Sequence, residues 1–194
     1  MTDRERQRWD QRYAADLRLA RAPSAWVVEH CLALPADAVV VDVAAGSGRH
    51  ARALAERGRR VVAVDFVERA VRAACATPGV WGVVADAARL PFADGSLDAI
   101  LVVNFLDRAL IATFARLLRP RGVLVAETYT LEHRALVDAG RARAPTNPAY
   151  MLEPGELPRL VDPLAVVASR EGVVRDEAGE RHVASVVARK TDGG

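Results

Sequence analysis

Short apolar runs rich in β-branched residues alternate along this chain with amphipathic segments that end at Gly or Pro. Apolar runs without polar alternation are typical of parallel strands buried on both faces. The expected strands cover residues 39–43, 60–65, 80–85, 97–103 and 123–128, and the expected intervening helices cover 49–57, 67–76 and 108–118. Strands separated by helices predict a parallel sheet built from right-handed βαβ units.

Two helical segments precede the first expected strand. In residues 4–20, Trp9 and Tyr13 share a spacing of four residues, which places them on one helix face. This face either packs on the domain or forms a lid over a ligand pocket. A second helix is expected over residues 24–34, with Ser24 as its N-cap.

The pattern changes after Thr130. Helices are expected over 131–139 and 155–161, with an irregular, proline-bearing stretch between them. Two final apolar runs, 164–169 and 182–189, flank a polar turn that contains Gly, which favours a β-hairpin. The sequence therefore predicts an α/β fold of the Rossmann-like, doubly wound type. Its seven-stranded, mostly parallel sheet would end in a C-terminal antiparallel hairpin.

Composition narrows the possible functions. A chain of 194 residues that is 51% apolar is expected to form a single globular domain. Its net charge of +2 does not favour a nucleic-acid partner. The charged N-terminus is unlike a signal peptide, and no apolar run is long enough to span a bilayer, so a cytoplasmic protein without membrane contact is expected. Cys31 and Cys75 lack CxxC partners and are expected to be small buried residues.

A turn of small residues follows the first expected strand. Residues 44–48 are Ala-Ala-Gly-Ser-Gly, so a ligand can approach the backbone closely, and glycine tolerates a positive φ there. The helix that begins at Arg49 presents free N–H groups to an acceptor or anion. Strand, glycine turn and helix together indicate a nucleotide site.

Two residues beside this turn discriminate between nucleotides. The dinucleotide fingerprint G-x-G-x-x-G, counted from Ala44, would place its third glycine where the chain has Arg49. A carboxylate at Asp42 would repel a pyrophosphate and would suit a cationic ligand. S-adenosylmethionine carries an ammonium and a sulfonium, and it has no phosphate.

The segment VDVAAGSGRH, residues 41–50, resembles the first motif of class I S-adenosylmethionine-dependent methyltransferases, with Ala44 at the first glycine position. The resemblance implies that Asp42 and the backbone at Ala44, Gly46 and Gly48 face the methionine end of the cofactor. It also covers the segment RLLRPRGVLVAE, in which Arg121 stands where the family usually has Gly.

Further motifs extend the resemblance to residues 39–128. Asp65 ends the second expected strand, where a carboxylate can accept both ribose hydroxyls, and Phe66 can pack on the adenine face. The segment VVADAARLPF is similar to the family's stretch after strand three, which implies that Asp86, with Ala87 beside it, contacts the adenine. Asn104 lies at the carboxyl end of the fourth expected strand, where open α/β sheets bind ligands.

The flanking segments WDQRY and NPAYMLEPGEL resemble the small bacterial branch that includes tellurite-resistance and thiopurine-type methyltransferases. This resemblance implies in-line methyl transfer to a small-molecule acceptor such as a thiol or a chalcogen oxyanion. Such soft nucleophiles do not require a catalytic base, and none is assigned. No metal site is expected. The candidate acceptor contacts are Trp9, Tyr13, Phe105, Tyr129 and Tyr150.

Within the single domain, residues 1–37 would form N-terminal helices or a lid, 38–130 the cofactor core, and 131–194 the substrate loop and final strands. Two alternatives stay open at this point. One is a nicotinamide-dependent oxidoreductase, and the other is a non-catalytic, regulatory module that binds S-adenosylmethionine. The sequence makes no prediction about the oligomeric state.

Overall fold

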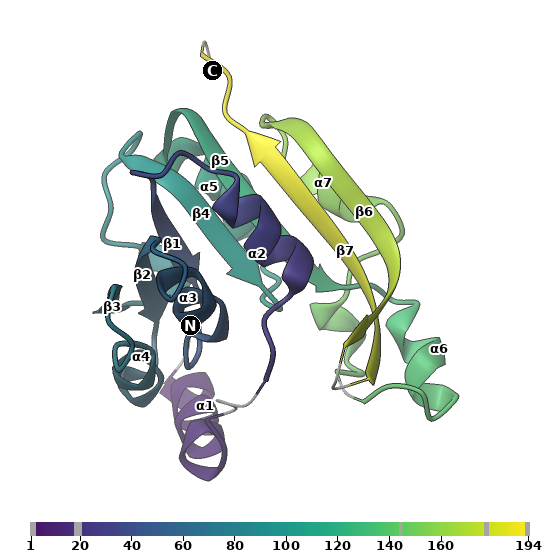
Figure 1. Ribbon diagram of the computed structural model, residues 1–194. Helices are drawn as coiled ribbons and strands as arrows, with labels where there is room; N and C mark the ends of the chain where they lie inside the picture. The colour runs from purple at the N-terminus through teal and green to yellow at the C-terminus, as the bar shows by residue number, and fades with distance from the viewer. Residues whose placement is uncertain (1–2, 18–20, 144, 177–178, 193–194) are drawn as a thin grey trace.

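Seven strands form one mixed sheet in the order β3-β2-β1-β4-β5-β7-β6 (Figure 1). The structure is a computed structural model that describes residues 3–17, 21–143, 145–176 and 179–192. The strands are β1 (Val39–Val43), β2 (Arg60–Asp65), β3 (Val80–Val84), β4 (Leu97–Val103), β5 (Leu118–Tyr129), β6 (Ala165–Asp176) and β7 (Gly179–Arg189). The helices are α1 (Asp3–Ala15), α2 (Ala25–Leu32), α3 (Arg49–Ala55), α4 (Glu68–Ala74), α5 (Arg108–Leu117), α6 (His133–Asp138) and α7 (Glu156–Leu160), with 3-10 turns η1 (Ala87–Arg89) and η2 (Pro148–Tyr150).

The first five strands run parallel, and β1 lies between β2 and β4. In β1, Val40, Val41 and Val43 are at most 2% exposed, as expected for a strand covered by helices on both faces. The carboxyl ends of β1, β2 and β4 therefore meet at one edge of the sheet. The predicted fold class is confirmed.

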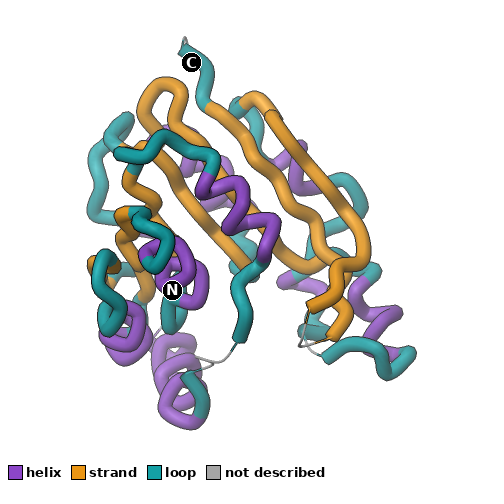
Figure 2. The backbone as a smooth tube through the Cα atoms, in the orientation of Figure 1, coloured by secondary structure: helices purple, strands orange, loops and turns teal. Residues whose placement is uncertain are grey.

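The C-terminal hairpin inserts in an antiparallel sense. Strand β7 pairs with β5 from Val123↔Arg189 to Tyr129↔Val183, and β6 pairs along the outer side of β7 (Figure 2). Both hairpin strands are longer than the sequence predicted. Strand β5 also begins five residues earlier than predicted, at Leu118, because Leu118 already pairs with Leu97 across a register shift.

Helices cover both faces of the sheet. Helices α2 and α3 pack on one face and α5 and α7 on the other, each over its own apolar cluster (Figure 1). Cys31 lies in the apolar cluster under α2 and α3, where burial raises the pKa of its thiol to about 12. The prediction that Cys75 is buried was wrong: it lies at the end of α4 and is exposed.

The N-terminal helix ends earlier than predicted. Helix α1 stops at Ala15, and residues 18–20 of the predicted segment 4–20 lie outside the described residues. Helix α1 packs beside α4, where Asp10 and Arg69 form an exposed ion pair at 3.3 Å. This contact brings α1 to the edge of the sheet where β1 ends (Figure 1).

Candidate cofactor and acceptor site

The turn after β1 has three residues in the left-handed region. The φ angles are 55° at Ala44, 57° at Gly46 and 76° at Gly48. Glycine adopts this conformation without strain, whereas alanine has a Cβ that opposes it. The turn is fixed to the sheet by the Ala45 N–H, which donates to the Val64 carbonyl at 3.0 Å. A backbone turn with little side-chain volume is thus held at the carboxyl edge of the sheet.

The two glycines of the turn have different neighbours. A Cβ on Gly46 would lie 2.8 Å from the Tyr13 hydroxyl, so α1 covers the turn at this point. A Cβ on Gly48 would lie 2.5 Å from the Ala74 Cβ, which means that Gly48 permits close packing against α4. The structure therefore places Tyr13 directly over the predicted cofactor turn, where a lid residue would lie.

Asp65, at the end of β2, binds the same turn. Its Oδ2 accepts the Gly46 N–H at 2.8 Å, and its Oδ1 accepts the Val67 N–H at 2.9 Å. The side chain is buried, and burial raises its pKa, which the backbone N–H groups of Val67, Gly46 and Phe66 oppose. Each oxygen keeps further acceptor capacity, so Asp65 can orient the turn and still accept from a ligand hydroxyl.

Asp42, in β1, is buried just before the turn. It is 2% exposed, it bonds to the backbone N–H of Ala51 in α3, and its Oδ2 has no hydrogen-bond partner among the described residues. Burial raises its pKa to about 7, opposed by the charge of Arg49. The sequence placed this carboxylate at the mouth of the turn. The structure buries it against α3, so its influence on a bound cation would be exerted through its field.

The remaining cofactor candidates surround the same edge. Phe66, just after Asp65, is half-buried. The Ala85 N–H donates to the Asp65 carbonyl at 3.0 Å. Asp86 caps η1 through the Ala88 N–H at 3.0 Å, and Ala87 is buried in the core. Asn104 is exposed after β4 with a φ of 56°, and its N–H donates to the Glu127 carbonyl at 2.8 Å.

The five aromatic acceptor candidates do not form one cluster. Trp9 and Tyr13 share a face of α1, with ring centroids 5.7 Å apart. Phe105 packs on the apolar cluster under α5, whereas Tyr129 is buried at 9% exposure with its ring centroid 4.6 Å from that of His133. Tyr150, in η2, is 49% exposed. Their roles toward an acceptor remain predictions.

A buried polar network at the end of β5 was not predicted from the sequence. Glu127 is 1% exposed, and its Oε2 accepts from Ser24 Oγ at 3.0 Å, Ser185 Oγ at 2.8 Å and Arg170 Nη2 at 3.0 Å. Its Oε1 lies 3.6 Å from Arg181 Nη1. These partners come from α2, β6 and β7, so no local spacing could indicate them.

The network continues toward the glycine turn. Arg49, the first residue of α3, is half-buried, and burial together with the nearby charge of Arg181 lowers its pKa. Ser24 holds the N-cap position of α2, as predicted, but its hydroxyl does not cap the helix. Instead its N–H donates to His50 Nε2 at 3.1 Å, and burial keeps the pKa of His50 well below its usual range. A neutral imidazole and a carboxylate thus hold Ser24 beside the turn.

The described residues offer neither a metal-binding group of side chains nor a membrane-spanning helix. Within the described residues, no group of three or more His, Cys, Asp or Glu side chains is placed to hold a metal ion. None of the helices in residues 3–17, 21–143, 145–176 and 179–192 is long and apolar enough to cross a membrane.

Comparison with known proteins identifies the segment that carries the glycine turn. Residues 41–126, from β1 to β5, match the family model described as a methyltransferase domain. This segment is therefore similar to class I S-adenosylmethionine-dependent methyltransferase domains. The prediction of this domain and of S-adenosylmethionine as its cofactor is confirmed, and the match favours a methyltransferase over a nicotinamide-dependent oxidoreductase.

One sequence relative and two solved structures are similar to this chain. A demethylmenaquinone methyltransferase of Thermobifida fusca is 37% identical over 99 residues, which cover 45% of this chain and 42% of that protein. The chain thus matches less than half of the length of this relative.

The two structures are similar in fold. A Methanosarcina mazei S-adenosylmethionine-dependent methyltransferase has a TM-score of 0.70 at 20% identity, covering 88% and 99% of the two chains. A structure reported for the conversion of a disulfide bond into a thioacetal group during echinomycin biosynthesis has a TM-score of 0.72 at 19% identity, covering 92% and 85%.

Proposed function

We propose that this protein transfers a methyl group from S-adenosylmethionine to a small soft nucleophile, a thiol or a chalcogen oxyanion. The observation that carries the proposal is the left-handed turn after β1, whose Gly46 N–H is held by the Asp65 carboxylate at 2.8 Å. Substituents of a ligand can approach such a turn closely, and the turn lies in the segment that matches the methyltransferase family.

The residues around the turn fit this cofactor. Asp65 retains acceptor capacity for ribose hydroxyls, with Phe66, Asp86, Ala87 and Asn104 at the same edge of the sheet. The backbone at Ala44, Gly46 and Gly48 would lie along the methionine end. Asp42 has a buried oxygen without a hydrogen-bond partner among the described residues. A positively charged ligand beside the turn would favour the ionised form of this carboxylate.

The bound cofactor supplies a methyl group whose bond to the sulfonium breaks as the bond to the acceptor forms. The protein has to align the acceptor and exclude water, which can lower the barrier by roughly 7–11 kcal/mol in favourable cases. Tyr13, whose hydroxyl lies near Gly46, would exclude water from the turn. Trp9, Phe105, Tyr129 and Tyr150 are proposed as further acceptor contacts.

The charge beside the site favours an anionic acceptor. Arg49 and Arg181 lie near one another by the glycine turn, close to Glu127 and Tyr129. Positive side chains concentrate anions and stabilise a thiolate or an oxyanion over its protonated form. The sulfur chemistry of the echinomycin structure is consistent with a sulfur acceptor. These features support placing the chain in the tellurite-resistance or thiopurine-type branch.

The proposal extends to partners and organisation. We expect a small-molecule acceptor without nucleic-acid or membrane partners, in the cytoplasm. We also propose that residues 1–194 act as one domain, with α1 and α2 in the N-terminal part or lid, residues 38–130 as the cofactor core, and residues 131–194 as the acceptor side.

Two measurements test the function. Calorimetric titration with S-adenosylhomocysteine is expected to give saturable binding. Incubation with methyl-labelled S-adenosylmethionine and a panel of thiols, selenite, tellurite and small carboxylic acids is expected to label a thiol or a chalcogen. Binding without transfer to any acceptor would favour the regulatory module, and absence of binding would contradict the proposal.

Asp65→Ala is expected to weaken S-adenosylhomocysteine binding about 10- to 100-fold. The change removes a carboxylate that orients the turn and would accept from the ribose, and hydrogen bonds to charged groups contribute about 1.5–3 kcal/mol. Calorimetric titration measures the Kd. Asp94→Ala, at an exposed residue paired with Arg116, is the matched control and should bind like the parent. Equal affinity of the Asp65→Ala variant and the parent would show that the ribose site is misplaced.

Ala44→Gly is expected to leave S-adenosylhomocysteine affinity within about twofold and to raise the free energy of unfolding by about 0.5–1 kcal/mol. Glycine relieves the left-handed strain at φ 55°, and this gain exceeds the entropy that glycine adds to the unfolded chain. Urea denaturation measures the change. Ala45→Gly, at a neighbour without a positive φ, should instead lower stability, and a loss of stability in both variants would contradict the strain argument.

A further inference from the structure

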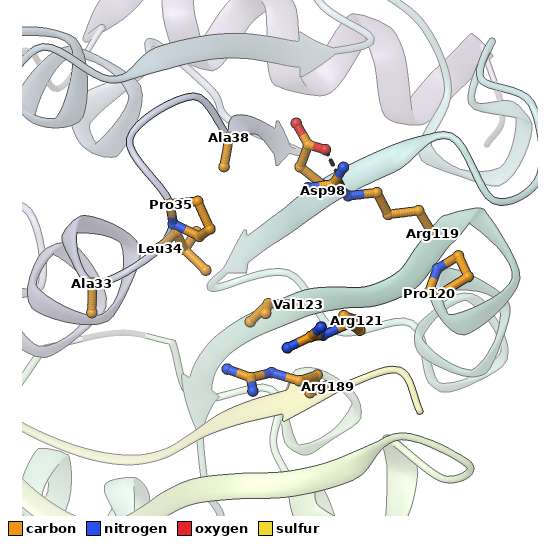
Figure 3. A pocket seen from close by; sticks show the side chains of 10 residues that line it. All are labelled: Ala33, Leu34, Pro35, Ala38, Asp98, Arg119, Pro120, Arg121, Val123 and Arg189. Carbon is orange, nitrogen blue, oxygen red and sulfur yellow. Dashed lines mark ion pairs between the residues drawn. The ribbon is translucent and has the colours of Figure 1, made fainter. Parts of the chain in front are cut away.

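A cavity of about 400 Å³ opens at the edge of the sheet opposite the glycine turn (Figure 3). It lies between the end of α2 and the start of β5, where the amino ends of β1 and β4 also meet. Its walls combine the apolar side chains of Leu34, Pro35 and Val123 with the side chains of Arg119, Arg121 and Arg189. Neither the cofactor nor the acceptor site described above includes any of these residues.

The charges in this cavity are not balanced. Asp98 is the carboxylate in the wall, and both of its oxygens are used: Oδ2 accepts the Val39 N–H at 2.8 Å and Oδ1 pairs with Arg119 Nε at 2.9 Å. Arg121 and Arg189 have no side-chain hydrogen bond or ion pair within the described parts of the chain. They lie on the paired strands β5 and β7 and both line the cavity (Figure 3), so their like charges repel. An anion between them would remove this repulsion.

The backbone at Arg121 supports a role for its side chain. Arg121 has a φ of 65°, a left-handed conformation that a glycine after Pro120 would adopt without strain. Its N–H donates to the Lys190 carbonyl at 3.0 Å, which anchors the turn beside the end of β7. The chain thus holds a long cationic side chain at a position whose backbone favours glycine, and that side chain lines the cavity.

We propose that this cavity binds a phosphomonoester with a small apolar body. Two guanidinium groups match a phosphate dianion in charge, and each can donate two parallel hydrogen bonds to it. Leu34, Pro35 and Val123 provide an apolar wall for the rest of the ligand, and the volume falls within the range of small-molecule sites. This site is separate from the proposed methyl transfer and does not depend on it.

Phenyl phosphate and inorganic phosphate are the probes. Calorimetric titration of the intact chain at constant ionic strength is expected to show saturable binding of both, with phenyl phosphate at least tenfold tighter. Arg121→Gly and Arg189→Gln should each weaken phenyl phosphate binding at least tenfold. Arg121→Gly should also raise the melting temperature, because glycine relieves the strained backbone, so its loss of binding cannot be ascribed to unfolding.

Arg72→Gln provides the matched control, because it removes one exposed arginine that pairs with Glu68 on α4, away from the cavity. This variant should bind phenyl phosphate within twofold of the parent, and all variants should keep their affinity for S-adenosylhomocysteine. Absence of saturable binding, or equal affinity in the Arg121→Gly and Arg72→Gln variants, would overturn the site. Equal affinity for the two probes would overturn the apolar part of the proposal.

Discussion

Replacing Glu127 by leucine is expected to lower the free energy of unfolding by about 3–5 kcal/mol, because it leaves the buried Ser24 and Ser185 hydroxyls without this acceptor and removes the carboxylate that faces Arg181. The carboxylate is 1% exposed and receives three hydrogen bonds, from Ser24, Ser185 and Arg170. Arg181 faces its other oxygen at 3.6 Å. Urea denaturation at pH 7 measures the loss.

One further variant at Glu127 and one control at an exposed glutamate separate charge from packing. Glu127→Gln keeps the shape and an acceptor oxygen, so we expect an intermediate loss of about 1–3 kcal/mol. Glu68→Leu removes an exposed carboxylate that pairs with Arg72 on α4 and should change stability by less than about 1 kcal/mol. If Glu127→Leu were as mild as Glu68→Leu, the network would not stabilise the fold.

Asp42→Asn is expected to be more stable than the parent at pH 8, with little difference near pH 4. Burial raises the pKa of Asp42 to about 7 in the folded protein, against 3.8 for an ordinary aspartate. Between about pH 4 and pH 7 the unfolded chain releases this proton while the folded chain keeps it. Stability therefore falls as pH rises through this window, by on the order of 4 kcal/mol for a shift of about three pH units.

Denaturation midpoints at pH 4.5 and pH 8 measure this effect. The asparagine is neutral throughout, so its advantage over the parent should appear as pH rises. Asp94→Asn, at an exposed carboxylate paired with Arg116, should leave the pH dependence unchanged. A variant less stable than the parent at pH 8 would mean that attraction to Arg49 outweighs the cost of burial. In the parent, a cationic ligand beside the turn should bind more tightly as pH rises from 6 to 8, because it favours the ionised carboxylate.

The parallel half of the sheet could be predicted closely because its signal is local. Valine-rich runs such as residues 39–43 and 60–65 are buried on both faces, and the structure has strands with those bounds. The glycine turn was equally local, since a run of small residues between a strand and a helix leaves few conformations. Strand β5 was predicted too short because Arg119, Pro120 and Arg121 look like a turn, although Leu118 already pairs with β4.

The surroundings of the site depended on contacts that a single sequence does not reveal. Ser24 and Glu127 are 103 positions apart, and neither residue has a local pattern that indicates the other. Asp42 was expected at the mouth of the turn because it precedes the glycines, yet the direction of its side chain is set by the position of α3. Arg121 was visible as a departure from the family pattern, but its neighbour Arg189 follows from the antiparallel pairing of β7.

The position of β7 has a consequence for synthesis of the chain on the ribosome. Strand β7 follows β6 in sequence but lies between β5 and β6 in the sheet. Until β7 has emerged from the ribosome, β5 therefore presents an unpaired apolar edge, and β6 has no strand that joins it to the sheet. Such an edge can pair with other nascent chains. Chaperone capture of stalled chains should thus be greatest when they end between β5 and β7, and should fall once β7 has emerged.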